Sequence, residues 1–244
     1  MSVSLQDIHL GFYSEDIPFW KELARQSTGP ILELGCGNGR VLLPLAQSGR
    51  PVYGIDNEWG VLALLRSRIT PDQGKYTRIL QADTAAFHFD LRFGLIIAPC
   101  NTYSSFSTET RRRTLSGVRF HLHEDGVFAL SLPNPTTFKH LPARSEPEVE
   151  EIFPHPLDGE PVQVSSGWER SDLSITVQWH YDHMLPDGGI ERISTQIKHN
   201  LISTREYLSE IRNAGFIINN TYGSYDWSPY RRDSPNLIIL ASKK

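Results

Sequence analysis

Residues 30–48 read PILELGCGNGRVLLPLAQS, and this stretch decides the fold. A short apolar run leads into glycines at every second position, Gly35, Gly37 and Gly39, and a helical pattern over 40–48 follows. Glycine lets the backbone turn sharply and lets a ligand approach the start of a helix without Cβ atoms in its path. The order strand, glycine loop, helix is typical of a nucleotide-type α/β domain.

The alternation of apolar runs and helical patterns continues to about residue 133. Further strands are predicted over 52–55, 77–80, 93–98 and 127–132, and helices over 61–69 and 108–121. Strands joined by helix-length connections form right-handed crossovers and a parallel sheet. The sequence therefore predicts an α/β fold with a Rossmann-like, doubly wound sheet.

A different pattern follows this region. Residues 133–160 are rich in proline and acidic groups, which favours a linker or lid. From 161 to 203 apolar and polar residues alternate, with PDGG at 186–189 as a hairpin turn, which predicts a small antiparallel β subdomain.

The C-terminal part is predicted to rejoin the sheet. Thr204 is expected to cap a helix over 205–214, and strands are expected over 216–221 and 237–241. The predicted organisation is one core, residues 1–142 with 204–244, and one insertion, residues 143–203, that serves as a substrate cover. A length of 244 residues fits one enlarged domain of this kind.

Two acidic residues follow the second and third predicted strands. Asp56 lies 21 residues after Gly35, at the tip of its strand, where a carboxylate can accept hydrogen bonds from both ribose hydroxyls. Asp83 follows the third strand, where it could accept from an adenine amino group. Both positions indicate a nucleoside-containing ligand.

Together these motifs resemble the class I S-adenosylmethionine (SAM)-dependent methyltransferases. The resemblance covers most of the chain, through ILELGCGNGRVLLPLA, VYGIDNE, QADTAAF, FGLIIAPCNTYSSF and HEDGVFALSLPNP in the family's order. It implies the class I methyltransferase fold, SAM as cofactor and methyl transfer as the reaction.

The resemblance assigns ten residues to the cofactor: Glu33, Gly35, Cys36, Gly37, Asp56, Asn57, Asp83, Thr84, Pro99 and Cys100. The glycine loop would pass the methionine part, with the glutamate supporting it. Asp56 and its neighbour would meet the ribose, and Asp83 and its neighbour the adenine. The proline and second cysteine would line the floor near the sulfonium.

A nicotinamide-binding Rossmann domain is the main alternative, because it uses similar glycines. Its fingerprint is GxGxxG, whereas this chain has GxGxG, and it gives no task to an acidic residue after the third strand. The sequence therefore favours SAM over NAD. An NAD-dependent oxidoreductase or a non-catalytic SAM-binding module are the alternatives of another class.

The chemistry needs alignment more than reactive side chains. A sulfonium methyl is already an activated electrophile, so the protein has to orient the acceptor and exclude water. Cys36 and Cys100 are therefore interpreted as packing residues, not as nucleophiles.

Two residues are candidates for work at the methyl group. Tyr13 matches, by resemblance, a tyrosine that closes over the cofactor; otherwise it packs a helix against the sheet. His121 matches a histidine near the acceptor in sugar N-methyltransferases; otherwise it caps its helix or is partly exposed.

The acceptor class follows from motif and charge. The segment Pro99–Tyr103 lacks the D/N/S-P-P-Y/F core of amino-directed DNA methyltransferases, and a net charge of −4 disfavours nucleic acid as a partner. The inserted strands and the C-terminal segment resemble small-molecule methyltransferases, including sugar-amine and glycine-type N-methyltransferases. We expect a small-molecule amine as acceptor, with O-methylation of a carboxylate or hydroxyl as the alternative.

The sequence also gives expectations for location, metal content and basic patches. Two cysteines, no apolar run of membrane-spanning length and an N-terminus without a basic region favour a cytoplasmic protein without a membrane partner. No metal site is expected, because His183 points away from His180 and Asp182 on a strand. Arg111–Arg113 is expected to be a solvated helix face.

Overall fold

The computed structural model describes residues 5–244; residues 1–4, part of the N-terminus interpreted above, lie outside the described residues. The chain divides into two compact units. The larger comprises Glu15–Thr137 and Ile202–Lys244, and the smaller combines Phe138–Leu201 with the N-terminal residues up to Ser14. The N-terminal segment thus groups with the antiparallel strands, whereas the predicted organisation placed it in the core.

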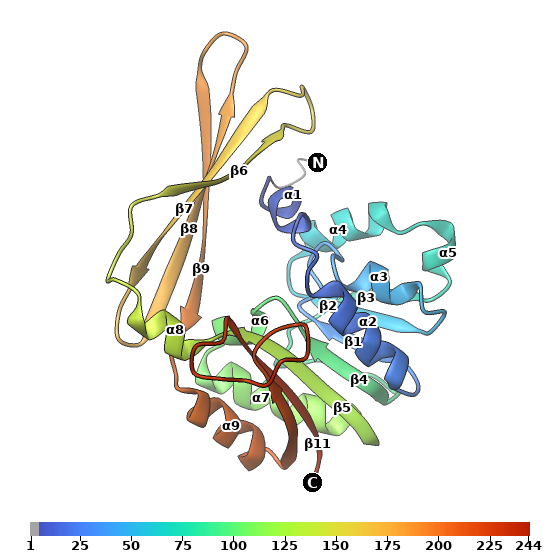
Figure 1. Ribbon diagram of the computed structural model, residues 1–244. Helices are drawn as coiled ribbons and strands as arrows, with labels where there is room; N and C mark the ends of the chain where they lie inside the picture. Colours follow the sequence, from blue (N-terminus) through green and yellow to red (C-terminus); the bar gives the residue numbers. More distant parts are fainter. Residues whose placement is uncertain (1–4) are drawn as a thin grey trace. The chain divides into compact units, whose positions relative to one another are not determined.

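The larger unit is built on a seven-stranded sheet, in the order β10-β11-β5-β4-β1-β2-β3 (Figure 1). Its strands are β1 (Ile31–Leu34), β2 (Val52–Asp56), β3 (Thr77–Gln81), β4 (Phe93–Ala98), β5 (Leu122–Pro133), β10 (Phe216–Tyr222) and β11 (Asn236–Lys243). The first five are parallel, whereas β11 runs antiparallel to β5 and β10 antiparallel to β11. The predicted doubly wound α/β fold is confirmed.

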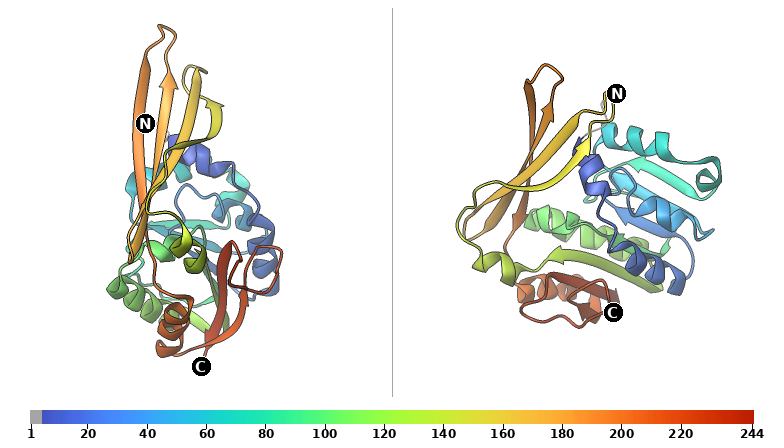
Figure 2. Two further views of the ribbon diagram at one scale, coloured as in Figure 1. Left: turned by 60° about the vertical axis from the view of Figure 1, so that its left-hand side comes forward. Right: turned by 45° about the horizontal axis from the view of Figure 1, so that its top comes forward.

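Helices cover both faces of this sheet (Figure 2). One face carries α2 (Ile17–Gln26), α3 (Leu42–Ala46) and α4 (Trp59–Arg68), and the other carries α7 (Thr108–His121) and α9 (Thr204–Asn213). Three shorter helices are α5 (Pro71–Gly74), α6 (Thr102–Ser105) and α8 (Pro135–His140). Neighbouring residues of a buried strand supply opposite faces: Ile31 packs in one apolar cluster and Leu32 in the other.

Serine side chains begin both helices of the second face. Ser107 accepts a hydrogen bond from the Thr110 amide at the start of α7. Ser203 forms a capping box with Glu206 at the start of α9, so the predicted cap at Thr204 was wrong by one residue.

The smaller unit is a four-stranded antiparallel sheet with one short helix, α1 (Leu5–Gly11). Its strands run in the order β6 (Glu148–Pro154), β7 (Pro161–Arg170), β8 (Ser174–Met184) and β9 (Ile190–Asn200). Its core comprises Leu5, Phe153, Val162, Val164 and Tyr181. The predicted antiparallel group is therefore correct, but residues 148–154, expected in a linker or lid, form a strand.

Candidate functional site

A cavity of about 440 Å³ lies at the carboxyl ends of the parallel strands β1 to β4. It is lined by Gly35, Asp56, Asn57, Ala82, Asp83, Thr84, Thr102, Ser105, Phe106 and Thr110. Ligands of open α/β sheets bind outside this edge. Five of the ten predicted cofactor residues line the cavity; Glu33, Cys36, Gly37, Pro99 and Cys100 do not appear in its lining.

Four amides of the glycine loop are already engaged, three by strand β2 and one within the loop. The Gly35 and Cys36 amides donate to the Ile55 carbonyl at 2.8 and 3.0 Å, and the Gly39 amide donates to the Cys36 carbonyl. The Gly37 amide donates to Asp56 Oδ2 at 2.9 Å. A loop that cradles phosphate must offer such groups to its ligand. These amides are engaged by other protein groups, which argues against a pyrophosphate cradle and hence against NAD.

Asp56 connects the loop to the next helix. Besides the Gly37 amide, its carboxylate accepts the Glu58 amide through Oδ1 at 3.0 Å, just before α4. Each carboxylate oxygen has two acceptor positions, so both still have capacity for a ligand hydroxyl. Asp56 therefore shapes the loop and faces the cavity at the same time.

The second acidic residue, Asp83, belongs to the turn after β3. Its Oδ1 accepts the Ala85 amide at 2.8 Å, which fixes the turn and leaves the carboxylate exposed at the cavity. Thr84 beside it is buried. Among the ten lining residues two are acidic and none is basic. Such a lining suits hydroxyl donors, amines and positive charge.

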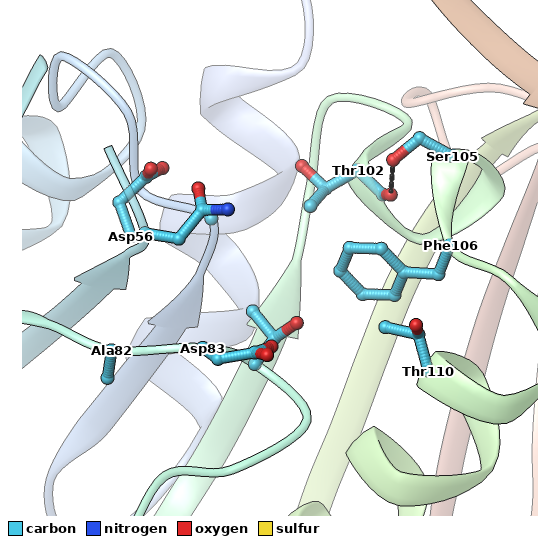
Figure 3. Close-up of a pocket in the computed structure, with 10 residues that line it drawn as sticks. Asp56, Ala82, Asp83, Thr102, Ser105, Phe106 and Thr110 are labelled. Atoms are coloured by element: carbon cyan, nitrogen blue, oxygen red, sulfur yellow. Dashed lines mark hydrogen bonds between the residues drawn. The ribbon is translucent and has the colours of Figure 1, made fainter.

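The opposite wall comes from α6 and the start of α7 (Figure 3). Thr102, Ser105, Phe106 and Thr110 form it, and the Ser105 hydroxyl donates to the Thr102 carbonyl at 2.7 Å. Phe106 brings a half-buried aromatic ring to the cavity. The sequence interpretation assigned no role to these residues, although Phe106 ends the quoted segment FGLIIAPCNTYSSF.

A buried acidic group precedes the glycine loop. Glu33 is 2% exposed and its Oε2 has no hydrogen-bond partner in the structure. Burial raises the pKa of the Glu33 carboxyl well above its ordinary value. The nearby Arg40 guanidinium makes two hydrogen bonds, at 2.6 and 2.7 Å, to Asp16. This buried carboxyl is not part of the cavity lining.

Cys36 occupies a packing position, whereas Cys100 is exposed and its Sγ accepts a hydrogen bond from Arg40 Nη2 at 2.6 Å. Cys36 is buried, and burial raises the pKa of its thiol. A Cβ at Gly54 would lie 2.8 Å from Cys36 Sγ, so the thiol fills the space above β2. Cys100 follows the buried Pro99 and has φ +58°, and Asn101 follows it at φ +62°. Two successive left-handed residues turn the chain from β4 into α6 and thus place the Thr102 wall.

His121 occupies a structural position. Its Nε2 accepts the Phe89 amide at 3.0 Å, so its Nδ1 carries the proton and donates to the Gly117 carbonyl at 2.8 Å. The ring is 2% exposed and packs 4.9 Å, centroid to centroid, from Phe87. With both nitrogens engaged and the ring outside the cavity lining, the geometry argues against the predicted catalytic role.

Tyr13 belongs to the smaller unit, two residues beyond the end of α1. Its side chain is 43% exposed. Its predicted closure over the cofactor stays a prediction.

Comparison with known proteins yields one consistent relationship. Residues 31–126 match the family described as "Methyltransferase domain". The YqeM protein of Bacillus subtilis (strain 168) is 21% identical over 231 residues, which cover 92% of this chain and 88% of YqeM.

Solved structures agree with this match. A SAM-dependent methyltransferase of Clostridium acetobutylicum ATCC 824 superposes with a TM-score of 0.81 at 13% identity, covering 98% of this chain and 95% of that one. This chain has the class I methyltransferase fold. CalS10 of Micromonospora echinaspora, an amino pentose methyltransferase, superposes at 0.76 with 16% identity, covering 100% and 98% of the two chains.

Fold and family match together support a SAM-dependent methyltransferase, as the sequence motifs predict. The cavity fits the cofactor, because its acidic lining suits a ligand with ribose hydroxyls and positive charge. Within residues 5–244, none of the helices is long and apolar enough to cross a bilayer.

Proposed function

We propose that this methyltransferase transfers the methyl group of SAM to an amine nitrogen of a small molecule in the cytoplasm. The observation that carries the proposal is the cavity at the ends of β1 to β4, where Asp56 and Asp83 face the ligand space without a basic residue in the lining. The engagement of the glycine-loop amides supports SAM over a dinucleotide as the cofactor, since the loop offers the ligand few amides.

Different lining residues are assigned to different parts of the cofactor. Asp56 accepts the ribose hydroxyls, with Asn57 beside it, and Asp83 accepts the adenine amino group. Phe106 offers its ring to the purine face, because aromatic rings stack readily on bases. Thr84, beside Asp83, completes the part of the cavity assigned to the purine. The position of these groups in the cavity lining and what each can accept or donate support these assignments.

The methionine end is held by the glycine loop. Gly35, Cys36 and Gly37 pass close to it, and the buried Glu33 near the end of β1 supports the loop. Pro99 and Cys100 form the floor near the reacting carbon. Their part is to close that side against water and to keep the backbone turn rigid.

The cofactor supplies a methyl group bonded to a positively charged sulfur. Transfer forms the nitrogen–carbon bond, breaks the carbon–sulfur bond and leaves the amine with a proton to lose to water or a base. The amine must enter deprotonated, so alignment is the main task of the protein. The predicted histidine base does not fit, because both nitrogens of His121 are engaged.

The amine preference rests on the likeness to CalS10, which acts on an amino pentose. The smaller unit, with Tyr13 on its N-terminal segment, is proposed as the substrate cover. O-methylation of a carboxylate or hydroxyl is the competing assignment.

Incubation with SAM carrying a deuterated methyl group tests the proposal. The acceptors are a panel of amino sugars and amino acids beside matched carboxylates and hydroxyl compounds, and products are measured by mass spectrometry. We expect the labelled methyl on nitrogen. Asp56→Asn, which keeps the side-chain size, should lose most activity, whereas the fully exposed control Asp90→Asn should keep it. Labelled oxygen products alone would reassign the acceptor.

A further inference from the structure

Two imidazoles and a carboxylate converge in the smaller unit, where the β6–β7 turn meets β8. His155 Nδ1 lies 3.0 Å from Asp158 Oδ1, and His183 Nε2 lies 3.2 Å from the same oxygen and 3.1 Å from Oδ2. The three potential ligand atoms all lie within 4.8 Å of one another. One nitrogen of each ring therefore points at a common centre.

The backbone holds this geometry without help from a ligand. His155 and Asp158 lie in the turn between β6 and β7, where the His155 amide donates to the Glu160 carbonyl at 2.7 Å and the Gly159 amide to the His155 carbonyl at 2.9 Å. His183 is on β8, where it pairs with Val162 of β7. The two rings stack 3.9 Å apart at an angle of 21°.

Burial and charge suit a cation. The side chains of His183 and His155 are 8% and 17% exposed, whereas Asp158 is 40% exposed, so the carboxylate is the side open to an incoming ion. Glu191 of β9 places Oε2 4.0 Å from His183 Nδ1, the nitrogen that faces away from the centre. A metal-bound histidine commonly presents its other N–H to such a carboxylate.

We propose that His155, Asp158 and His183 bind a zinc ion. Imidazole nitrogen and carboxylate oxygen are zinc ligands, and three protein ligands leave the fourth position to water. Asp158 and Glu191 together match the charge of a divalent cation. On binding, each imidazole carries its proton on the outer nitrogen, His155 Nε2 and His183 Nδ1. The ion joins the β6–β7 turn to β8, and none of its three protein ligands is among the residues that line the cofactor cavity.

Calorimetric titration of the tag-free, chelator-treated full chain with zinc chloride tests the site. We expect one ion per chain and at least about tenfold weaker binding in His155→Ala, His183→Ala and Asp158→Asn. The matched control is His180→Ala on the same strand, whose ring contacts Ser194 and not the cluster. Its zinc affinity should equal that of the unchanged protein.

X-ray absorption of the zinc-loaded chain gives a result that does not depend on variants. Two imidazole rings and one or two oxygens at about 2.0–2.2 Å are expected. Absence of saturable binding, a spectrum without imidazole, or equal loss in His180→Ala would overturn the site. SAM affinity, measured in parallel, tests the proposed function separately, since these four residues do not line the cofactor cavity.

Discussion

At Gly35 the backbone has φ +70°, and a Cβ there would lie 2.6 Å from Thr102 Cγ2. Gly35→Ala therefore pushes the two walls of the cavity apart, and we expect at least about a tenfold loss of SAM affinity together with a lower Tm. Calorimetry and thermal unfolding measure the two effects.

The matched control is Gly60→Ala in α4, where a Cβ meets nothing within 4 Å. It should keep the affinity and raise stability by up to about 1 kcal/mol, because alanine favours a helix over glycine. Equal SAM affinity in the two variants would contradict the close packing of loop and wall.

His121 makes a second residue-scale prediction. Its removal leaves the Phe89 amide without an acceptor and opens a hole beside Phe87. We expect His121→Ala to lower the free energy of unfolding by about 2–4 kcal/mol, while kcat per folded molecule stays within about twofold. Urea unfolding and steady-state kinetics measure this. A kcat loss of about a hundredfold at unchanged stability would restore the catalytic interpretation.

At the scale of elements, a buried ion pair joins α7 to α9. The Arg111 side chain is 2% exposed and contacts Glu210 of α9 at 2.8 and 2.9 Å, and it also donates to the Phe106 carbonyl at 2.7 Å. The sequence interpretation placed Arg111 on a solvated face; this is wrong, because α9 covers that face.

Arg111→Met should therefore cost about 3–5 kcal/mol of stability, the usual result of breaking a buried pair. It should also weaken SAM binding, because Phe106 loses the contact that holds its backbone. Arg112→Met is the control: its partner Glu109 is exposed, so we expect a change below about 1 kcal/mol. Urea unfolding of both variants measures the two changes in stability.

The elements also show what sequence patterns can predict. The helix expected over 108–121 is α7 without change, because a long amphipathic pattern follows a serine cap. Strand β6 was not predicted. It is an edge strand on which Glu148, Glu150 and Glu151 are exposed, and such a strand does not need alternating apolar and polar residues.

Some residues of the candidate site were predictable from the sequence, and others were not. Asp56 ends β2 and Asp83 lies two residues beyond the end of β3, so the sequence could place both at the carboxyl edge of the sheet. The wall of Thr102, Phe106 and Thr110 depends on the left-handed turn after β4 and on the packing of α7, which no local pattern specifies. The contact of Asp158 with His183 joins residues 25 positions apart, through strand pairing that spacing alone does not give.

On the scale of the whole molecule, each unit contains a buried histidine with a lowered pKa. Burial lowers the pKa of His199 to about 4 and also lowers that of His121. Both titrate near pH 6.5 when unfolded, so the unfolded chain binds protons first as pH falls. Stability is full above about pH 6.5 and declines toward pH 4.

At about pH 5 the His199 contribution alone amounts to about 2 kcal/mol of lost stability. Urea unfolding at about pH 7.5 and 5 measures how much stability the protein loses between the two pH values. In His199→Gln this loss should be smaller by about 2 kcal/mol. The exposed control His88→Gln should leave it unchanged. Equal losses in all three proteins would show that His199 is protonated in the folded state.

The proposed function requires a cavity that holds SAM and not a dinucleotide. Isothermal titration of the full chain with SAM, S-adenosylhomocysteine and NAD measures this directly. We predict saturable binding of the first two at one molecule per chain, loss of at least about tenfold in Asp56→Asn, and no binding of NAD. Saturable binding of NAD with no heat from SAM would contradict it.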